Sequence, residues 1–339
     1  MILPVHLSEK SYDIVLASGA LGKAGELFDL NRKVLVVTDS GAPTEYAEAI
    51  VRQCAEPTLA VLDAGEESKN IGNFEKLLGM MLKKGFTRRD AVVAVGGGVV
   101  GDLSGFVAAS FMRGIDFYNV PTTLLSQLDS SVGGKTAIDL CGVKNCVGAF
   151  WQPKKVLIDP DVLQTLDDRQ FRSGMAEAVK MAATSSKELF TLFENSEPDG
   201  FRKDIEQIIA SALQIKISVV EADETETGLR RILNFGHTVG HAVESASGMA
   251  LTHGESVAIG MLPMAGDGVR QRIEAVLKKL GLPTECGIPA EDLISFLLHD
   301  KKKAGNKIYT VYVNEIGNGE IVQEEMTDVA NKTIERMKK

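Results

Sequence analysis

Residues 91–111, AVVAVGGGVVGDLSGFVAASF, decide the fold expected for the first half of the chain. A run of small apolar residues predicts a buried strand from Ala91 to Val95, and a helix is predicted from Leu103 to Phe111. The glycines between them, beginning at Gly96, satisfy the pattern Gly-x-Gly-x-x-Gly. In such a strand, turn and helix, the backbone N–H groups and the helix dipole favour a bound phosphate. The stretch predicts a nucleotide-binding unit, although a simple tight turn would also explain it.

Predicted strands and helices alternate around this stretch. Further strands are predicted at 33–38, 59–62 and 116–120, and helices at 44–54 and 73–84. Alternation of this kind implies a parallel sheet covered by helices. We therefore expect an α/β nucleotide-binding domain over residues 1–160, ending at Pro160.

The second half is predicted to be mostly helical. An apolar stripe with helical spacing runs from Phe201 to Val219, and only a short strand is predicted, at Ile308 to Val313. We expect a mostly α-helical metal- and substrate-binding domain over residues 161–339. A ligand site is expected in the cleft between the two domains.

A second candidate phosphate loop follows the strand at 116–120. Residues 121–140 read PTTLLSQLDSSVGGKTAIDL and present two threonine hydroxyls and, at Lys135, an ammonium group on a glycine turn. The spacing is not that of a Walker motif, which needs a glycine further upstream. Lys144 and Asn145 then precede an apolar strand region that ends near Ile158.

Three of the five histidines lie close together in the sequence. His237 and His241 are one helical turn apart on one helix face, and His253 stands where a second helix is expected to begin. Any one of the three could be a satisfied core residue, but together they predict a metal centre. The zinc-protease motif is excluded because Thr238 occupies the place of its general-base glutamate.

A catalytic zinc site takes three protein ligands and leaves one position open. The best carboxylate for such a site is Glu177, in the apolar helical run SGMAEAVKMAA. An ionised glutamate buried there is costly unless a metal or cation lies beside it. Lys180 offers a competing explanation, a plain ion pair within the helix.

Composition limits the classes of ligand. The chain has 339 residues, 44% of them hydrophobic and 24% charged, as expected for two soluble domains. A net charge of −9 argues against general binding to nucleic acid or a membrane surface, so an anionic ligand needs locally placed lysines and arginines. Four cysteines without a Cys-x-x-Cys pair indicate neither a disulfide framework nor a thiolate zinc site. With no signal peptide or membrane-spanning run recognisable, we expect a cytoplasmic protein.

Six motifs along nearly the whole chain carry a resemblance to a known family. They read GGGVVGDLSGFVAASFMRG from Gly96, PTTLLSQLDSSVGGKTAID from Pro121, KNCVGAFWQP from Lys144, SGMAEAVK from Ser173, LRRILNFGHTVGHA from Leu229 and HGESVAIGM from His253. Together they resemble the 3-dehydroquinate synthase family of the shikimate pathway, which leads to the aromatic amino acids. The resemblance implies that family's two-domain fold, NAD, a divalent metal that is usually zinc, with cobalt as the alternative, and a homodimer.

The resemblance also implies roles for individual residues. Glu177, His237 and His253 would be the metal ligands, and His241 would lie beside them or transfer a proton. Arg113 would be donated from the neighbouring subunit of the dimer. The substrate would be lined by Asp129, Lys135, Lys144, Asn145, Lys180, Lys216, Arg230 and Asn234. NAD would be bound by Asp39, Glu66, Lys69, Gly97, Gly98, Asp102, Thr122 and Thr123, with Lys135 and Lys144 contributing to both sites.

The implied reaction is the conversion of 3-deoxy-D-arabino-heptulosonate 7-phosphate to 3-dehydroquinate and phosphate. NAD would oxidise the substrate transiently, phosphate would leave by β-elimination, and the hydride would return before ring opening and aldol closure. The enzyme would thus be a phosphate-eliminating carbon–oxygen lyase in which NAD is not consumed.

Three places depart from the family pattern. Residues 140–143 read Leu-Cys-Gly-Val where many members have Thr-Pro-Leu-Gly, and the stretch from Gly260 to Leu280 is shorter than usual. Lys301, Lys302 and Lys303 offer more lysines than the family's Asp-Lys-Lys motif needs.

Three other functions are alternatives to this one. Another sugar-phosphate cyclase would keep the metal ligands and change the substrate residues, whereas Arg113, Asn145, Lys180, Asn234 and His241 follow the dehydroquinate pattern. A metal-dependent alcohol dehydrogenase of similar build would consume NAD stoichiometrically, and a non-catalytic nucleotide or metal sensor would show no turnover.

Overall fold

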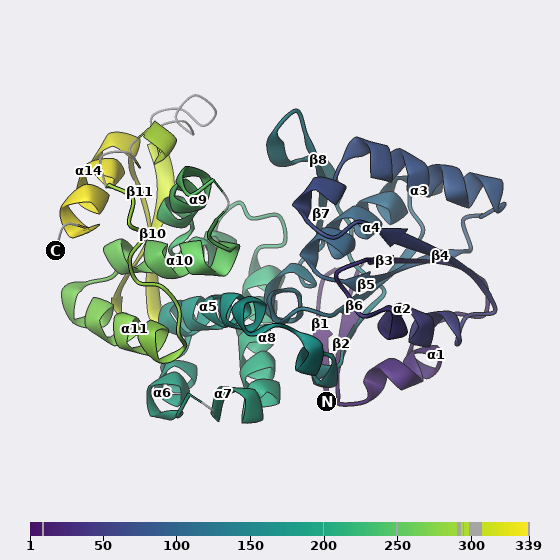
Figure 1. Ribbon diagram of the computed structural model, residues 1–339, viewed down its shortest axis with the longest axis horizontal. Coiled ribbons are helices and arrows are strands. Elements are labelled where there is room, and N and C mark those ends of the chain that lie inside the picture. Colours follow the sequence, from purple (N-terminus) through teal and green to yellow (C-terminus); the bar gives the residue numbers. More distant parts are fainter. Residues whose placement is uncertain are drawn as a thin grey trace. The chain divides into compact units, whose positions relative to one another are not determined.

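The computed structural model describes residues 1–8, 10–198, 200–248, 250–289, 293, 295–297 and 307–337. Lys301, Lys302 and Lys303 therefore lie outside the described residues. The chain divides into two compact units, Met1–Asp167 and Asp168–Lys339 (Figure 1). Each unit is described by itself.

The N-terminal unit is built on a seven-stranded sheet with the strand order β1-β2-β9-β6-β5-β3-β4. From β2 to β4 every neighbouring pair is parallel, and only β1 runs antiparallel to its neighbour. The strands are β1 (Ile2–Val5), β2 (Tyr12–Leu16), β3 (Lys33–Asp39), β4 (Glu56–Leu62), β5 (Ala91–Gly96), β6 (Asp116–Pro121) and β9 (Lys155–Ile158).

Helices and a hairpin complete this unit. The α-helices are α1 (Ala24–Leu27), α2 (Thr44–Val51), α3 (Ile71–Lys83) and α4 (Gly98–Ser110). The short helical turns are η1 (Ala20–Lys23), η2 (Glu66–Ser68), η3 (Phe111–Arg113), the π-helical turn η4 (Ser126–Ser130) and η5 (Pro160–Thr165). Strands β7 (Lys135–Leu140) and β8 (Val143–Phe150) pair as a separate antiparallel hairpin.

The two faces of the sheet carry separate hydrophobic cores because alternate side chains of a strand point to opposite faces. On β3, Val36 belongs to the core that includes Ile50 of α2, whereas Val37 belongs to the core that includes Leu77 of α3. Central strands buried on both faces need continuous apolar runs, which explains the sequence from Ala91 to Gly96.

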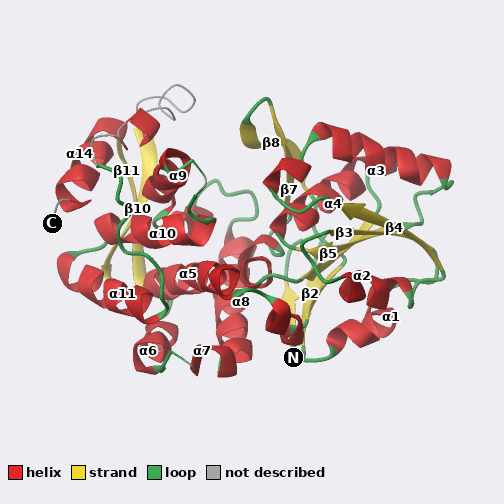
Figure 2. Cartoon of the chain, viewed as in Figure 1, coloured by secondary structure: helices red, strands yellow, loops and turns green. Residues whose placement is uncertain are grey.

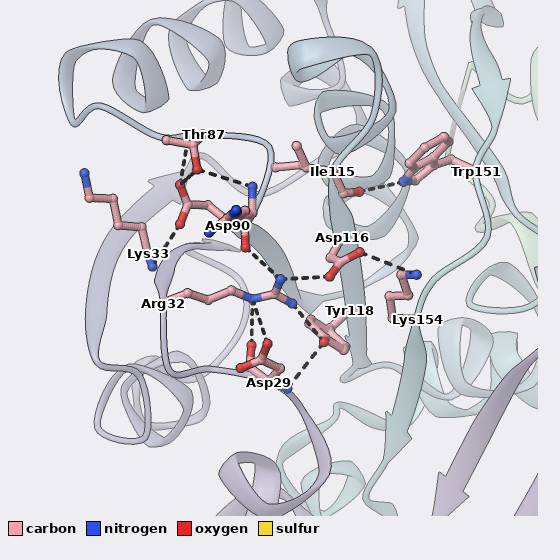
Figure 3. Close-up of polar contacts among 11 residues, drawn as sticks. Asp29, Arg32, Lys33, Thr87, Asp90, Ile115, Asp116, Tyr118, Trp151 and Lys154 are labelled. Atoms are coloured by element: carbon pink, nitrogen blue, oxygen red, sulfur yellow. Dashed lines mark hydrogen bonds and ion pairs between the residues drawn. The ribbon is translucent and has the colours of Figure 1, made fainter.

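A polar network fastens the starts of three parallel strands (Figure 3). The guanidinium of Arg32, just before β3, lies 2.8 Å from Oδ2 of Asp116 at the start of β6, and it donates to the hydroxyl of Tyr118 at 3.0 Å. Asp90, just before β5, accepts a hydrogen bond from the backbone N–H of Lys33 at 3.2 Å. This network lies at the amino ends of the strands, so the carboxyl ends, where ligands of parallel sheets bind, stay clear of it.

The C-terminal unit is mostly helical (Figure 2). Its helices are α5 (Asp168–Ser185), α6 (Lys187–Asn195), α7 (Gly200–Lys203), α8 (Ile205–Ala222), η6 (Leu229–Asn234), α9 (His237–Ala246), α10 (His253–Met261), η7 (Leu262–Met264), α11 (Asp267–Lys279) and α14 (Met326–Met337). An antiparallel hairpin is formed by β10 (Lys307–Glu315) and β11 (Asn318–Glu325). Within the described ranges, no helix combines the length and hydropathy needed to cross a bilayer.

The α/β class with a mostly helical second half is confirmed, and the strands and helices predicted up to residue 120 form at nearly the expected places. Strand β4 begins three residues before the predicted strand at 59–62, and α2 ends three residues before the end of the predicted helix at 44–54. The largest difference is at α4, which begins at Gly98 and not at Leu103 because the extended Gly97 is its N-cap and the glycines after it join the helix. Residues 121–140 form the π-helical turn η4 and strand β7 and not a single loop, and Lys144 and Asn145 lie within β8.

Candidate metal centre and active site

Glu177 is buried in the middle of α5, with 1% of its surface exposed. Nζ of Lys180, one turn further along the helix, contacts its Oε2 as an ion pair. Neither oxygen of Glu177 has a hydrogen-bond partner of acceptable geometry within the described part of the chain. Buried polar atoms are nearly always satisfied, so this carboxylate has acceptor capacity to give to a ligand.

Two histidines face this carboxylate. His237 is the first residue of α9 and His253 the first residue of α10. The Nε2 atoms of His237 and His253 lie 3.8 and 3.5 Å from Oε1 of Glu177. One ligand atom from each of the three residues lies within 4.8 Å of the other two. The arrangement brings together the three residues that the sequence predicted as metal ligands.

The other nitrogen of each imidazole lies beside an acceptor. Nδ1 of His237 is 3.3 Å from the carbonyl oxygen of Phe235, and Nδ1 of His253 is 3.3 Å from Oε2 of Glu244. When Nδ1 carries the proton, the lone pair of Nε2 is free for a metal. Both imidazoles are therefore oriented as ligands, and two histidines with one carboxylate form a donor set that suits zinc with an open position.

Close backbone contacts explain why glycines surround the histidines. A Cβ atom on Gly260 would lie 2.1 Å from the carbonyl oxygen of Gly236 and 2.6 Å from the backbone nitrogen of Gly240. Only glycines allow α9 and α10 to pack this closely. A Cβ atom on Gly254 would lie 2.0 Å from the carbonyl oxygen of Ser173, so α10 also meets α5 through a glycine.

The two imidazoles differ in their pKa values in the metal-free protein. Burial and then the charge of Lys180 lower the pKa of His237 to about 3. Burial also lowers that of His253, but the carboxylates of Glu177 and Glu244 outweigh it and raise its pKa to about 9. Burial raises the pKa of Glu177, yet Lys180 and the histidines hold it well below its usual value. A metal would replace the proton that His253 carries.

His241 lies next to this set without belonging to it. Its ring centroid is 5.4 Å from that of His237 and 5.8 Å from that of His253. Sequence reasoning missed Glu244, although it could have been found. It follows His241 by three residues and His237 by seven, which places all three on one face of α9.

The same unit contains three buried cations, one of which, Lys180, contacts Glu177. Lys180, Lys216 and Arg230 are 1%, 4% and 3% exposed. The backbone N–H of Arg230 donates to the carboxylate of Asp223 at 3.0 Å. Desolvation raises the pKa of Asp223, but this bond and those from Thr227 and Gly228 lower it to about 2.

Asn234 belongs to the same turn as Arg230, at the end of η6. Its Nδ2 donates to Oε1 of Glu226 at 2.8 Å. Glu226 has a positive φ of 61°, so the turn before η6 takes a backbone conformation that is uncommon outside glycine.

The residues predicted for NAD follow the carboxyl ends of three neighbouring strands of the N-terminal unit. Asp39 ends β3, Gly97 and Gly98 follow β5, and Thr122 and Thr123 follow β6. Ligands of parallel sheets bind at this edge. A Cβ atom on Gly98 would come within 3.1 Å of Oγ of Ser130, so a side chain there would be crowded.

The other residues predicted for NAD form an ion-pair cluster. Nζ of Lys69 lies 2.7 Å from Oδ2 of Asp102 and 3.5 Å from Oε1 of Glu66. Lys69 is 4% exposed. Burial raises the pKa of Asp102 to about 6 even though Lys69 lowers it.

Four further predicted residues of this unit lie in η4 and in the strands of the β7–β8 hairpin. Asp129 is in η4, Lys135 begins β7, and Lys144 and Asn145 are in β8. The backbone N–H of Asn145 donates to Oδ1 of Asp139 at 2.7 Å, which ties the two strands beside the predicted residues.

Arg113 is exposed and ends η3. It has a φ of 68° and follows Met112 at 50°, so two consecutive non-glycine residues adopt the left-handed conformation. The indole of Trp151 packs against the next residue, Gly114, where a Cβ atom would lie 2.2 Å from the ring. Nε1 of Trp151 also donates to the carbonyl of Ile115 at 3.1 Å. Strained backbone that the surroundings hold in place is typical of functional sites.

Comparison with known proteins gives a consistent result over nearly the whole chain. The family model for the 3-dehydroquinate synthase N-terminal region matches residues 59–173, and the one for the C-terminal region matches residues 174–303. The 3-dehydroquinate synthase of Streptococcus mutans serotype c is 40% identical over 356 residues, covering 98% of this chain and 100% of the relative. That of Picosynechococcus sp. is 40% identical, with 96% of each chain covered.

Solved structures of related enzymes share the fold. The 2-epi-5-epi-valiolone synthase from Streptomyces hygroscopicus, with NAD⁺ and Zn²⁺ bound, has a TM-score of 0.88 at 27% identity over 98% of both chains. A 2-deoxy-scyllo-inosose synthase complexed with carbaglucose-6-phosphate, NAD⁺ and Co²⁺ has a TM-score of 0.89 at 24% identity, covering 99% of this chain and 100% of that one. The family models and the near full-length sequence identities show that this chain belongs to the 3-dehydroquinate synthase family.

Proposed function

We propose that this chain converts 3-deoxy-D-arabino-heptulosonate 7-phosphate to 3-dehydroquinate and phosphate. The observation that carries the proposal is the convergence of Glu177, His237 and His253 in a member of the 3-dehydroquinate synthase family. The proposal assigns the metal to the C-terminal part of the chain, residues 161–339, and NAD to residues 1–160, with predicted substrate contacts in both parts.

The metal, zinc or cobalt, would act as a Lewis acid toward the substrate hydroxyls and make removal of a proton easier. Glu177, His237 and His253 would hold it, and Glu244 would keep His253 in the tautomer that presents Nε2. His241, with its ring centroid 5.4 Å from that of His237, is close enough to pass a proton to or from a group beside the metal.

The substrate carries a carboxylate and a phosphate, whereas the chain has a net charge of −9. Recognition of these two anionic groups therefore needs lysines and arginines placed close to the substrate. Lys180, Lys216 and Arg230 are buried, so their charges would act in a medium of low dielectric constant, where attraction to an anion is strong. Asn234, on the same turn as Arg230, would add an amide to the set.

NAD would take a hydride from the substrate and return it within the same turnover, so that oxidation and reduction cancel. The glycines at the start of α4 support this assignment, because their backbone N–H groups and the helix dipole favour a pyrophosphate. The solved 2-deoxy-scyllo-inosose synthase and 2-epi-5-epi-valiolone synthase carry NAD⁺ together with Co²⁺ and Zn²⁺, respectively.

We also propose a homodimer in which Arg113 reaches the site of the partner subunit. Arg113 is exposed on a strained turn that Trp151 holds in place, which suits an arginine presented outward from its own subunit. The four free cysteines agree with a reducing cytoplasm, where we place the protein.

The experiment is to incubate the purified protein with the substrate, Zn²⁺ and NAD and to identify the carbocyclic product. Formation of 3-dehydroquinate that His253→Ala abolishes is the expected result. A parallel incubation with glucose 6-phosphate tests the alternative that the protein is another sugar-phosphate cyclase. This sugar is chosen because a related structure binds its carba analogue. Turnover of glucose 6-phosphate without turnover of the proposed substrate would overturn the proposal.

A further inference from the structure

The first turn of α10 is docked on one face of α5. Along α5, three residues at four-residue intervals lie on one helix face. They meet three consecutive residues of α10 in reverse order. The pairs are Arg169 with Glu255, Ser173 with Gly254, and Glu177 with His253. The last pair belongs to the candidate metal centre, and the first two hold the same two helices together beside it.

The pair formed by Arg169 and Glu255 has a fixed geometry. Nε of Arg169 donates to Oε1 of Glu255 at 2.8 Å, and Nη2 donates to Oε2 at 2.7 Å. Nη2 also donates to the carbonyl oxygen of Ala250 at 2.6 Å. A planar guanidinium that binds both carboxylate oxygens restrains orientation as well as distance.

Glu255 connects this arginine to the start of α10. Its Oε2 accepts a hydrogen bond from the backbone N–H of Thr252 at 2.7 Å, and the hydroxyl of Thr252 accepts one from the N–H of Glu255. This capping box closes the first turn of the helix, which contains His253. Arg169 therefore restrains the turn from which His253 reaches Glu177.

We propose that Arg169 is a positioning residue of the metal centre. It acts through Glu255, which holds the first turn of α10 and with it His253. The inference rests on the metal site of the proposed function and adds a residue that touches neither metal nor substrate. Metal–ligand distances tolerate only about 0.2 Å, so loosening the turn that carries one ligand lowers affinity for the metal.

The chain contains a matched control. Arg272 of α11 and Glu194 of α6 form the same two-pronged pair, with Nε–Oε1 at 2.7 Å and Nη2–Oε2 at 2.8 Å. The exposed fractions of the two arginine side chains are similar, 54% for Arg169 and 47% for Arg272. Neither α6 nor α11 carries a candidate metal ligand, so loss of this pair should affect the fold alone.

The test compares Arg169→Ala, Arg169→Lys and Arg272→Ala as full-length proteins. Competition with a chromophoric chelator gives the Zn²⁺ dissociation constant, and absorption spectra of the Co²⁺-loaded proteins report the ligand geometry. We expect Arg169→Ala to raise the dissociation constant about tenfold or more and to change the cobalt spectrum, as loss of supporting contacts does in other metal sites. Arg169→Lys should lie between Arg169→Ala and the wild type, and Arg272→Ala should match the wild type.

Equal metal affinity and equal cobalt spectra for Arg169→Ala and Arg272→Ala would overturn the inference. If Arg169→Ala does not fold, the pair Arg169→Lys and Arg272→Lys carries the same comparison, because each variant keeps the charge and loses the two-pronged geometry. A wild-type protein that binds no metal would refute the proposed metal site itself. Stoichiometric metal and 3-dehydroquinate formation by the wild type, with no difference between the variants, would refute only the role of Arg169.

Discussion

Oε2 of Glu244 lies 3.3 Å from Nδ1 of His253, whose Nε2 faces Glu177. This contact fixes which nitrogen of the ring is free for a metal. We expect Glu244→Ala to weaken Zn²⁺ binding by about 10- to 100-fold, as loss of such partners does elsewhere. Glu244→Gln keeps an oxygen acceptor and should lose less. Isothermal titration of the metal-free proteins checks this, and identical affinities for Glu244→Ala and the wild type would remove Glu244 from the site.

Lys180 neutralises Glu177 in a buried position, where each has about 1% of its surface exposed. Lys180→Met leaves only the protonated imidazole of His253 beside the buried carboxylate, so it should lower the free energy of unfolding of the metal-free protein, by at most about 3–5 kcal/mol. Added Zn²⁺ should restore more stability to this variant than to the wild type, because the cation takes over the neutralising role. Urea titrations with and without metal measure both effects. Equal stabilisation by Zn²⁺ would contradict a metal bound at Glu177.

Arg113 provides a prediction about assembly. If it completes the site of the partner subunit, Arg113→Ala and His237→Ala are each inactive but complement each other. After subunit exchange, random mixed dimers should recover about a quarter of the wild-type activity per site, because one intact site forms in half of the dimers. Native mass spectrometry confirms exchange. Full exchange without recovered activity would place Arg113 in its own subunit's site or outside the reaction.

Asp102 should make the free energy of unfolding depend on pH. Burial raises its pKa from 3.8 to about 6 in the folded protein. The folded state therefore binds the proton more tightly than the unfolded chain, so the stability from this group is complete below pH 3.8 and is lost as the pH rises through about 6.

In Asp102→Asn this contribution disappears. The difference in free energy of unfolding between wild type and Asp102→Asn should therefore fall from pH 4.5 to pH 7 or so, in urea titrations at matched ionic strength. A difference that does not change with pH would mean that Asp102 has an ordinary pKa beside Lys69.

The sequence predicted best where a single physical pattern determined the structure. The apolar run from Ala91 to Gly96 can only be a strand buried on both faces, and the spacing of His237 and His241 can only place them on one face of a helix. Residue spacing alone did not identify the three candidate metal ligands. Family motifs selected Glu177, His237 and His253, and the structure shows the glycine contacts that bring their helices together.

Features that depend on long-range packing were not predictable in this way. Strand β1 alternates buried and exposed residues but is short and contains Pro4, so its sequence alone does not identify it as a strand. The structure shows it paired with β2. The pairs Arg169–Glu255 and Arg272–Glu194 look alike in sequence, as charges on helix surfaces. Only the structure shows that Arg169 pairs with Glu255, two residues from the candidate metal ligand His253.

In the proposed reaction NAD is used and regenerated in each turnover. The most direct test measures phosphate release from 3-deoxy-D-arabino-heptulosonate 7-phosphate by the purified protein with Zn²⁺ and a trace of NAD, while absorbance follows NADH. We predict many phosphates released per NAD, with 3-dehydroquinate formed and no accumulation of NADH. NADH that accumulates in proportion to the product would contradict the account and indicate a dehydrogenase.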